Sequence, residues 1–427
     1  MNRTRSMLVV GVALASITAA CSSSAKVTSH PTTTSSSTPT TPVSQPPIPA
    51  PKGLPAFYSV PQPLPNIPGK LLKSAAVPVP GLHGTMYRVM YVSESLQKTP
   101  VAVSGLIAIP SGTPPAAGFP VVSWAHGTDG MADKCAPSLD PGSGTNVGLA
   151  NLLLDHGWVV TATDYQGEGT PGLHPYIAGV NAARDTIDIV RAVRTLPAAH
   201  ASNRYVVWGH SQGGHTAMFA LTIGRQYAKE LKLEGVVAGA PPSQFFALYA
   251  YLKGSAFRYY LLMAAGGLHA AYGDQAPLDA ILTPAGVKLT AVLDKGCAGY
   301  VSDQVGGVNI DSIVKADPFT VPAWRKVLKA DDPQNFAKPS PVPLLMIQGG
   351  SDEQIPVVST QLLATHLCGI GQNLERWIYP GQSHAGVIGP SSGDMIRWIT
   401  DRFAGGPNPD PYKPVGLAGI ETTTCPS

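Results

Sequence analysis

The chain has 427 residues and a formal net charge of +3, with Lys and Arg nearly balanced by Asp and Glu. Hydrophobic residues make up 44% of the chain, enough for a large core, which excludes a wholly disordered protein. The balanced charge lacks the clustered basic surface that nucleic-acid binding needs, so we expect no nucleic-acid partner.

The first 20 residues have the pattern of an export signal. Arg3 and Arg5 form a short positive segment, and the apolar run over 7–20 is too short to span a bilayer. Small residues then precede Cys21, in a pattern that resembles the lipobox of bacterial lipoproteins, although Thr18 stands where the lipobox prefers Leu or Val. The alternative is a plain secretory signal with an incidental cysteine. We predict a signal peptide over 1–20 and an exported protein, lipid-anchored through Cys21 to the outer face of a bacterial membrane or cell envelope.

A Ser/Thr/Pro-rich segment follows the signal. Of the 31 residues from Ser22 to Lys52, 22 are Ser, Thr or Pro, and none is acidic or aromatic. Such a segment cannot bury enough apolar surface to offset its ordering entropy. We therefore expect a disordered tether over 21–52, which would lift a folded domain away from the membrane.

Four further cysteines fit an oxidising compartment. They are Cys135, Cys297, Cys368 and Cys425. Four cysteines outside the cytosol suggest two disulfides, with three possible pairings. The sequence has neither a CxxC pair nor an HExxH motif, so we expect no metal site, and we predict no cofactor.

The remaining chain alternates apolar runs with helical patterns. The runs over 86–92 and 101–109 predict an opening antiparallel pair of strands, and six further short runs predict buried strands. These six lie at 120–125, 158–163, 205–208, 233–238, 343–347 and 375–379. Residues 181–196 show helical spacing, with Ile187, Val190 and Val193 on one face.

This alternation predicts an α/β fold with a doubly wound, mainly parallel sheet. It stops after residue 242, where a segment rich in Phe, Tyr, Leu and Ala begins, and it resumes at about residue 342. We therefore predict one α/β core formed by 53–242 and 342–427, interrupted by an insertion over 243–341.

Ser211 is the candidate nucleophile. The sequence GHSQG over 209–213 matches G-x-S-x-G, and it lies between a buried strand pattern and the helical stretch 215–226. Strand, sharp turn and helix form the nucleophile elbow of α/β-hydrolases. The alternative is an ordinary helix N-cap. A second match around Ser391 has no clear strand before it and no histidine after it, so we interpret it as a chance match.

His384 is the candidate base, because a serine hydroxyl needs a neighbouring base to become a nucleophile. It lies in a loop directly after the last predicted strand. His215, His269 and His366 also follow Ser211, but they lie in the elbow helix, in the insertion and in a predicted later helix. Since His384 must be neutral to accept a proton, activity is expected to fall in acid.

Asp352 is the candidate acid that orients the base, with Glu353 as its nearest rival. It lies in the loop at the carboxyl end of the predicted strand 343–347, where ligand and catalytic groups gather in parallel sheets. For the oxyanion hole we predict the backbone N–H of Gln212, directly after the nucleophile. The second predicted donor is the N–H of Thr128, in the loop HGTDG after strand 120–125; the alternative there is a glycine-rich turn without a catalytic role.

Five short motifs in a fixed order resemble the secretory lipase family that includes fungal lipase A, within the α/β-hydrolase superfamily. They are 124–128 (WAHGT), 162–167 (ATDYQG), 209–214 (GHSQGG), the Asp352 loop, and 379–384 (YPGQSH). The resemblance extends over nearly the whole chain after residue 57. It implies a Ser211, Asp352 and His384 triad, the same residues that the spacing of strands and loops predicts.

The resemblance also implies two disulfides, Cys135–Cys297 and Cys368–Cys425. It further implies that the insertion over 243–341 is a helical cap above an acyl pocket. Seven cap aromatics are candidates for lining that pocket or for packing the cap core: Phe245, Phe246, Tyr249, Tyr251, Phe257, Tyr259 and Tyr260. His126, Asp164 and Tyr165 are interpreted as structural neighbours of the site.

These observations predict a serine hydrolase that cleaves carboxylic esters, a lipase or esterase, through an acyl-enzyme. The expected partners are a lipid or small acyl ester and, through the N-terminal anchor, a membrane; we expect a monomer. A serine peptidase or an acyltransferase would share the triad, and a non-catalytic binding lipoprotein would require a lost triad member. Covalent labelling by a fluorophosphonate distinguishes a non-catalytic binding lipoprotein from the esterase, the peptidase and the acyltransferase.

Overall fold

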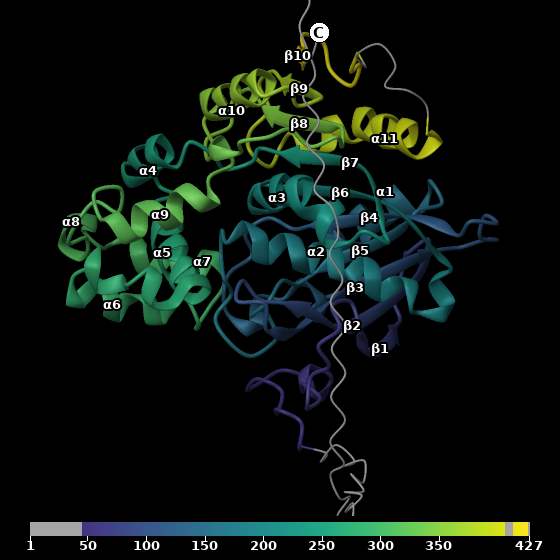
Figure 1. The fold of residues 1–427 in the computed structure, drawn as a ribbon, viewed down its shortest axis with the longest axis horizontal. Helices are drawn as coiled ribbons and strands as arrows, with labels where there is room; N and C mark the ends of the chain where they lie inside the picture. Colours follow the sequence, from purple (N-terminus) through teal and green to yellow (C-terminus); the bar gives the residue numbers. More distant parts are fainter. Residues whose placement is uncertain (1–44, 406–412, 426–427) are drawn as a thin grey trace, which may run out of the picture. The chain divides into compact units, whose positions relative to one another are not determined.

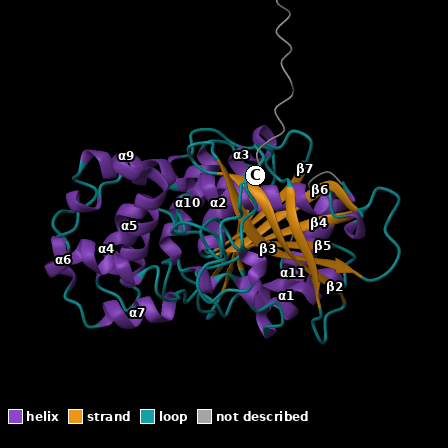
Figure 2. Cartoon of the chain, turned by 90° about the horizontal axis from the view of Figure 1, so that it is seen from below, coloured by secondary structure: helices purple, strands orange, loops and turns teal. Residues whose placement is uncertain are grey.

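The computed structural model describes residues 45–405 and 413–425. Within them, ten strands form one sheet in the order β1-β2-β3-β5-β4-β6-β7-β8-β9-β10 (Figures 1 and 2). Their bounds are β1 Leu71–Val77, β2 Gly84–Glu94, β3 Pro100–Pro110, β4 Phe119–Ala125, β5 Val159–Thr163, β6 Ala201–His210, β7 Lys232–Gly239, β8 Leu344–Gly349, β9 Leu374–Tyr379 and β10 Glu421–Cys425.

The centre of the sheet is parallel and its two edges are antiparallel. The six strands from β5 to β9 pair in parallel, whereas β1, β2 and β3 join at one edge and β10 at the other in antiparallel pairs. The predicted antiparallel opening pair, the six buried strands and the doubly wound parallel sheet are therefore confirmed.

Helices cover both faces of the sheet, as a doubly wound sheet requires. One face packs against α2 (Gly179–Arg194), α3 (Gln212–Tyr227) and α10 (Val357–Gly369), and the other packs against α1 (Gly144–Leu154) and α11 (Ile388–Ala404). Two separate hydrophobic clusters result, each formed by one face of the sheet and its helices.

The segment between β7 and β8 is helical and has its own core. It contains α4 (Phe245–Lys253), α5 (Tyr259–Tyr272), α6 (Pro284–Leu289), α7 (Ala298–Gly306), α8 (Ile310–Ile313) and α9 (Pro322–Asp331). Figure 2 shows these helices gathered beside the sheet rather than on either of its faces. Their side chains, with Trp324 and Leu293 fully buried among them, form a third hydrophobic cluster.

Two consecutive carboxylates at the end of α9 bond this segment internally, and the first of them also joins it to the core. Asp331 accepts hydrogen bonds from the N–H of Gly179, at 2.8 Å, and from the hydroxyl of Tyr272, at 2.7 Å. Asp332 accepts from the N–H of Phe245 at 2.8 Å, which holds the start of α4. Both are buried, and burial raises the pKa of Asp331 to about 7.

The structure joins Cys135 to Cys297 and Cys368 to Cys425, the pairs that the family resemblance implies. The first bond connects the loop after β4 with the helical segment, next to the backbone hydrogen bond from Ala298 to Asp129. The second bond attaches strand β10 to helix α10.

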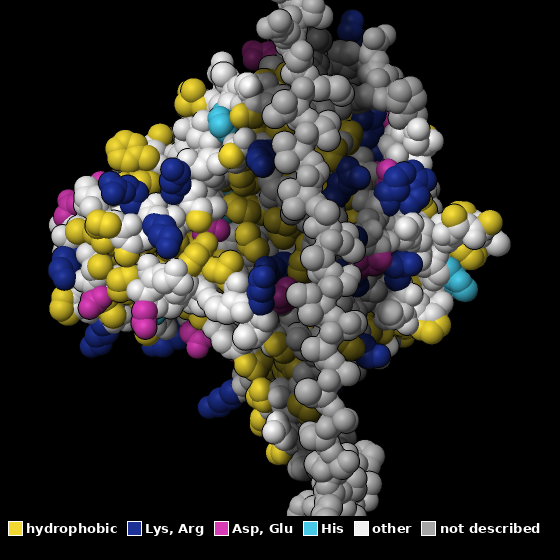
Figure 3. Space-filling view, viewed as in Figure 1, with side chains coloured by type: hydrophobic (Ala, Val, Ile, Leu, Met, Phe, Trp, Pro, Cys, Tyr) yellow, Lys and Arg dark blue, Asp and Glu magenta, His cyan; other side chains and the backbone are white. Residues whose placement is uncertain are grey.

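The last residues of the predicted tether belong to the part of the chain that the structure describes. Within it, Ile48 and Val60 exchange backbone hydrogen bonds of 2.8 Å. The predicted signal peptide, Cys21 and most of the tether lie outside the described residues. Among the described helices, none is both long and apolar enough to cross a membrane. On the face shown in Figure 3, Lys and Arg are interspersed with Asp and Glu.

Candidate active site

Ser211 occupies a strained turn between β6 and α3. Its φ of 60° and ψ of −120° are unusual for a residue with a side chain, and such strain is concentrated at functional sites. Its N–H donates to the carbonyl of Gly239 at 2.9 Å, which fixes the turn. Only glycine fits at position 213, because a Cβ there would lie 1.8 Å from the carbonyl oxygen of Ala125. The predicted strand–turn–helix geometry is therefore present. By contrast, Ser391 lies inside helix α11 and donates to the carbonyl of Ile388 at 3.3 Å.

His384 and Asp352 meet at the carboxyl ends of β8 and β9. The Nδ1 atom of His384 lies 3.0 Å and 2.9 Å from the two carboxylate oxygens of Asp352. Asp352 also accepts from the N–H groups of Ile355, at 2.8 Å, and Gln354, at 3.0 Å. Burial opposes ionisation of Asp352, but these hydrogen bonds, led by that of His384, hold its pKa below the usual value. Asp352 therefore remains a carboxylate.

Glu353, the rival for the acid, has another partner. Its Oε2 atom accepts from the backbone N–H of His384 at 3.0 Å, so it holds the loop rather than the ring. The Nε2 atom of His384 is buried and has no hydrogen-bond partner among the described residues. It is the atom that a base would use toward a serine, and catalytic hydrogen bonds often tighten only when substrate is bound.

The other histidines after the elbow make structural contacts. His215 Nε2 lies 2.7 Å from the carbonyl of Asp331, His269 Nδ1 3.0 Å from that of Ala276, and His366 Nε2 2.8 Å from that of Phe336. His210, whose ring centroid lies 4.8 Å from that of His384, has its pKa lowered by burial, and further by His384, to about 3. His210 is therefore neutral beside the His384 ring.

The loop after β4 passes directly over Ser211. A Cβ added to Gly127 would lie 3.7 Å from the Cβ of Ser211. Gln212 is the first residue of α3, so its N–H is one of the donors that a helix leaves without an internal partner. The hydroxyl of Thr128 bonds the hydroxyl of Tyr176 at 2.8 Å. Both predicted oxyanion donors thus belong to segments that border the nucleophile.

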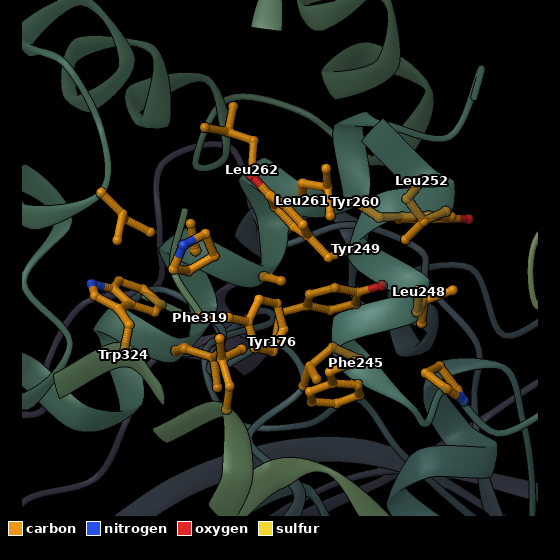
Figure 4. Close-up of a pocket in the computed structure, with 18 of the residues that line it drawn as sticks. Tyr176, Phe245, Leu248, Tyr249, Leu252, Tyr260, Leu261, Leu262, Phe319 and Trp324 are labelled. Atoms are coloured by element: carbon orange, nitrogen blue, oxygen red, sulfur yellow. The ribbon is translucent and has the colours of Figure 1, made fainter. Parts of the chain in front are cut away.

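An apolar pocket lies in the helical segment (Figure 4), and Ser211 is among the residues that line it. It encloses about 1150 Å³ of space between the atoms, its open mouth included. Its lining comes mainly from α4, α5, α8 and α9, and includes Phe245, Tyr249, Tyr260, Phe319 and Trp324. Of the seven aromatics considered from sequence, Phe245, Tyr249 and Tyr260 line it, whereas Phe246 is 65% exposed.

Several residues near the site were not predicted from the sequence. Tyr176 and Gln354 line the pocket, and His174 and Glu168 are buried, with His174 bonded to the side chain of Gln212. All except Gln354 lie in the Gly-rich stretch after β5, where only Asp164 and Tyr165 were expected to neighbour the site. Among the described residues, no group of His, Cys, Asp and Glu is arranged to hold a metal ion.

The model of the "Secretory lipase" family matches residues 144–410. Secreted triacylglycerol lipase LIP4 of Malassezia globosa is 26% identical over 75% of this chain and 72% of its own. A probable inactive lipase of Mycobacterium tuberculosis is 24% identical over 81% of this chain and 80% of its own. Among solved structures, Candida antarctica lipase A in its closed state superposes with a TM-score of 0.74 and 20% identity. The superposition covers 86% of this chain and 89% of that structure. That likeness confirms the α/β-hydrolase fold, and the family match shows that the chain belongs to the secretory lipase family.

Proposed function

We propose that this protein is a serine hydrolase that cleaves carboxylic esters with an extended apolar acyl group. The observation that carries the proposal is that Ser211 lines an apolar pocket, with the His384–Asp352 pair at the adjoining strand ends. An acyl chain would lie among Phe245, Trp324 and their neighbours, and its carbonyl would reach Ser211. The triacylglycerol lipases among the relatives support the same class of substrate.

The proposed reaction has two halves. The Ser211 hydroxyl attacks the ester carbonyl while His384 Nε2 takes its proton and later gives it to the leaving alcohol. Asp352 keeps the proton of the ring on Nδ1, so that Nε2 is free to accept. The N–H groups of Gln212 and Thr128 hold the tetrahedral oxyanion, where each donor contributes about 3 kcal/mol. In the second half, water attacks the acyl carbonyl while His384 takes its proton, and Ser211 leaves with that proton, so that the acid is released.

Hydrolysis of p-nitrophenyl esters from C2 to C18 tests the proposal. The apolar lining of the pocket predicts higher kcat/KM for acyl chains of C8 and longer than for acetate. The Ser211→Ala variant serves as the blank at each length. A preference for C2 would contradict the assignment of the pocket to the acyl chain, and equal turnover in the blank would contradict the nucleophile.

We further propose that the protein is exported and anchored by a lipid on Cys21. The apolar run before Cys21 and the small residues that precede it support this proposal. Two acyl chains on one cysteine would hold the protein on a membrane far more firmly than one. We expect labelled palmitate to enter the wild-type chain in a bacterial host, and the Cys21→Ala variant to lose the label and leave the membrane fraction. An unlabelled wild type released into the medium would indicate a plain secretory signal instead.

A further inference from the structure

A buried carboxylate lies behind the proposed oxyanion hole without a close hydrogen-bond partner. Glu168 is 0% exposed, and neither of its carboxylate oxygens has a hydrogen-bond partner among the described residues. His126 Nε2 and His174 Nε2 each lie 3.8 Å from one of its oxygens. Burying such a group costs several kcal/mol unless another charge compensates it. The two rings connect Glu168 with both segments that supply the proposed oxyanion donors.

His126 is the group that compensates Glu168. Its Nδ1 atom lies 2.7 Å from the carbonyl of Gly127 and 3.2 Å from a carboxylate oxygen of Asp129, while its Nε2 faces Glu168. Nδ1 is thus placed to donate, whereas Nε2 has no hydrogen-bond partner among the described residues and faces a Glu168 oxygen at 3.8 Å. Burial by itself would lower the pKa of His126, but Glu168 and Asp129 raise it to about 9. Burial likewise raises the pKa of Glu168 well above its usual value, and His126 is the group that lowers it. The imidazolium form of His126 therefore depends on Glu168 being ionised, and in that charged pair each group offsets the cost of burying the other.

The contact of His126 with Gly127 acts on the proposed oxyanion donor. The carbonyl of Gly127 and the N–H of Thr128 belong to one peptide group, so a proton donated to the oxygen draws electrons from the nitrogen. Hydrogen bonds at the two ends of an amide strengthen one another, most strongly when the donor is charged. Resting on the proposed function, we infer that His126, held as a cation by Glu168, polarises the Gly127–Thr128 peptide and makes the Thr128 N–H a stronger oxyanion donor.

The second ring holds Gln212 without adding charge. His174 Nδ1 lies 2.9 Å from the carbonyl of Gln166 and donates to it, so its Nε2 accepts from the side-chain amide of Gln212 at 2.8 Å. Burial, with the nearby charge of His126, lowers the pKa of His174 to about 3. The ring thus stays neutral, and His126 is the one cation of the cluster.

The surroundings of His126 define what can influence its charge. The titratable groups that act on it or stack with it are Glu168, Asp129, His174, Asp164 and Tyr165, whose ring centroid lies 4.4 Å away. Asp164 is already engaged by Ser104 Oγ at 2.6 Å and by the N–H of Ser138 at 2.8 Å. Asp129 has a half-exposed side chain, so solvent screens it, and Glu168 is the buried charge that determines the protonation of His126.

Replacing Glu168 with glutamine tests this role in the full chain. We expect kcat for a p-nitrophenyl ester to fall roughly tenfold with KM unchanged, less than the loss on removing an oxyanion donor outright. The wild-type rate should decline as pH rises through about 9, where His126 loses its charge. In the Glu168→Gln variant this alkaline decline should move to lower pH. A fall in kcat with an unmoved pH profile would overturn the inference, because it would indicate a packing role alone, and so would an unchanged kcat.

Two further variants separate charge from folding. Asp188→Asn removes another carboxyl that is 0% exposed and that accepts from Ser93 and Arg191 instead of facing His126, and it should leave kcat and its pH profile unchanged. His126→Asn places an amide donor near the position of Nδ1 without a charge; it should lower kcat and abolish the alkaline decline. It keeps the inference testable if Glu168→Gln fails to fold. If the His126→Asn variant had the same kcat as the wild type, the inference would be overturned.

NMR titration of labelled histidine measures the charge independently of turnover. We expect His126 to titrate near pH 9 in the wild type and lower in Glu168→Gln. A wild-type His126 that is neutral at pH 7 overturns the inference even if the enzyme is active. If no ester is hydrolysed by the wild type, the proposed function fails, and the titration still shows whether Glu168 holds His126 as a cation.

Discussion

Replacing Ser211 with alanine is expected to lower kcat for the preferred p-nitrophenyl ester by roughly 10⁵- to 10⁶-fold, because the variant cannot form an acyl-enzyme. Labelling by a fluorophosphonate should disappear with the activity. The fold should survive, since the turn is held by the backbone hydrogen bond to Gly239 and by the glycines around it. Circular dichroism and the melting temperature check that point.

Ser391 provides the matched control for this prediction. It lies in the second G-x-S-x-G sequence, is buried to the same degree as His384, and donates within its own helix. We expect Ser391→Ala to keep full labelling and turnover within a factor of two. Loss of labelling in Ser391→Ala, with labelling retained in Ser211→Ala, would reverse the assignment of the nucleophile.

Asp352→Asn is expected to lower kcat by about 10⁴-fold while leaving the loop intact. An asparagine can still accept from the N–H groups of Ile355 and Gln354 through its oxygen. Its amide would then face His384 Nδ1 as a donor, which forces the ring proton onto Nε2, the atom that must accept from Ser211. The measurement is kcat over a pH series, with KM and melting temperature recorded for each variant.

Glu353→Gln distinguishes the two neighbouring carboxyl groups. Glu353 contacts the backbone N–H of His384 and not its ring, and a glutamine oxygen can accept the same hydrogen bond. We therefore expect less than a tenfold loss of kcat. A larger loss in Glu353→Gln than in Asp352→Asn would assign the orienting role to Glu353.

The central strands and the elbow could be predicted because their signals are local. The run before Ser211 is apolar and contains β-branched residues. Glycine is required after Ser211 because the backbone of Gly213 lies very close to that of Ala125. Strands β1 and β10 were missed because they are edge strands with polar, partly exposed sequences. Their pairing is determined by neighbours distant in sequence and, for β10, by the Cys368–Cys425 bond.

The cluster behind the proposed oxyanion hole could not be predicted from spacing. Glu168 and His174 lie between β5 and α2, in a stretch with three glycines that has the composition of an exposed turn, yet both are fully buried. They meet His126 and Gln212 only because β4, β5 and β6 are adjacent and parallel. Likewise, Asp185 and Asp188 on α2 are buried and bonded to Gln166 and Ser93, although their spacing alone resembled a polar helix face.

The position of β10 has a consequence for how the chain can be made and altered. Strand β10 follows helix α11 in the chain, and until it is in place the outer edge of β9 exposes unpaired backbone groups. In a chain that has not finished folding, this edge can pair with another unfinished chain. A truncation before Glu421, or a bulky fusion directly after Cys425, would prolong that exposure. Purification tags are therefore better placed between Cys21 and residue 45, where they also leave the proposed signal peptide intact.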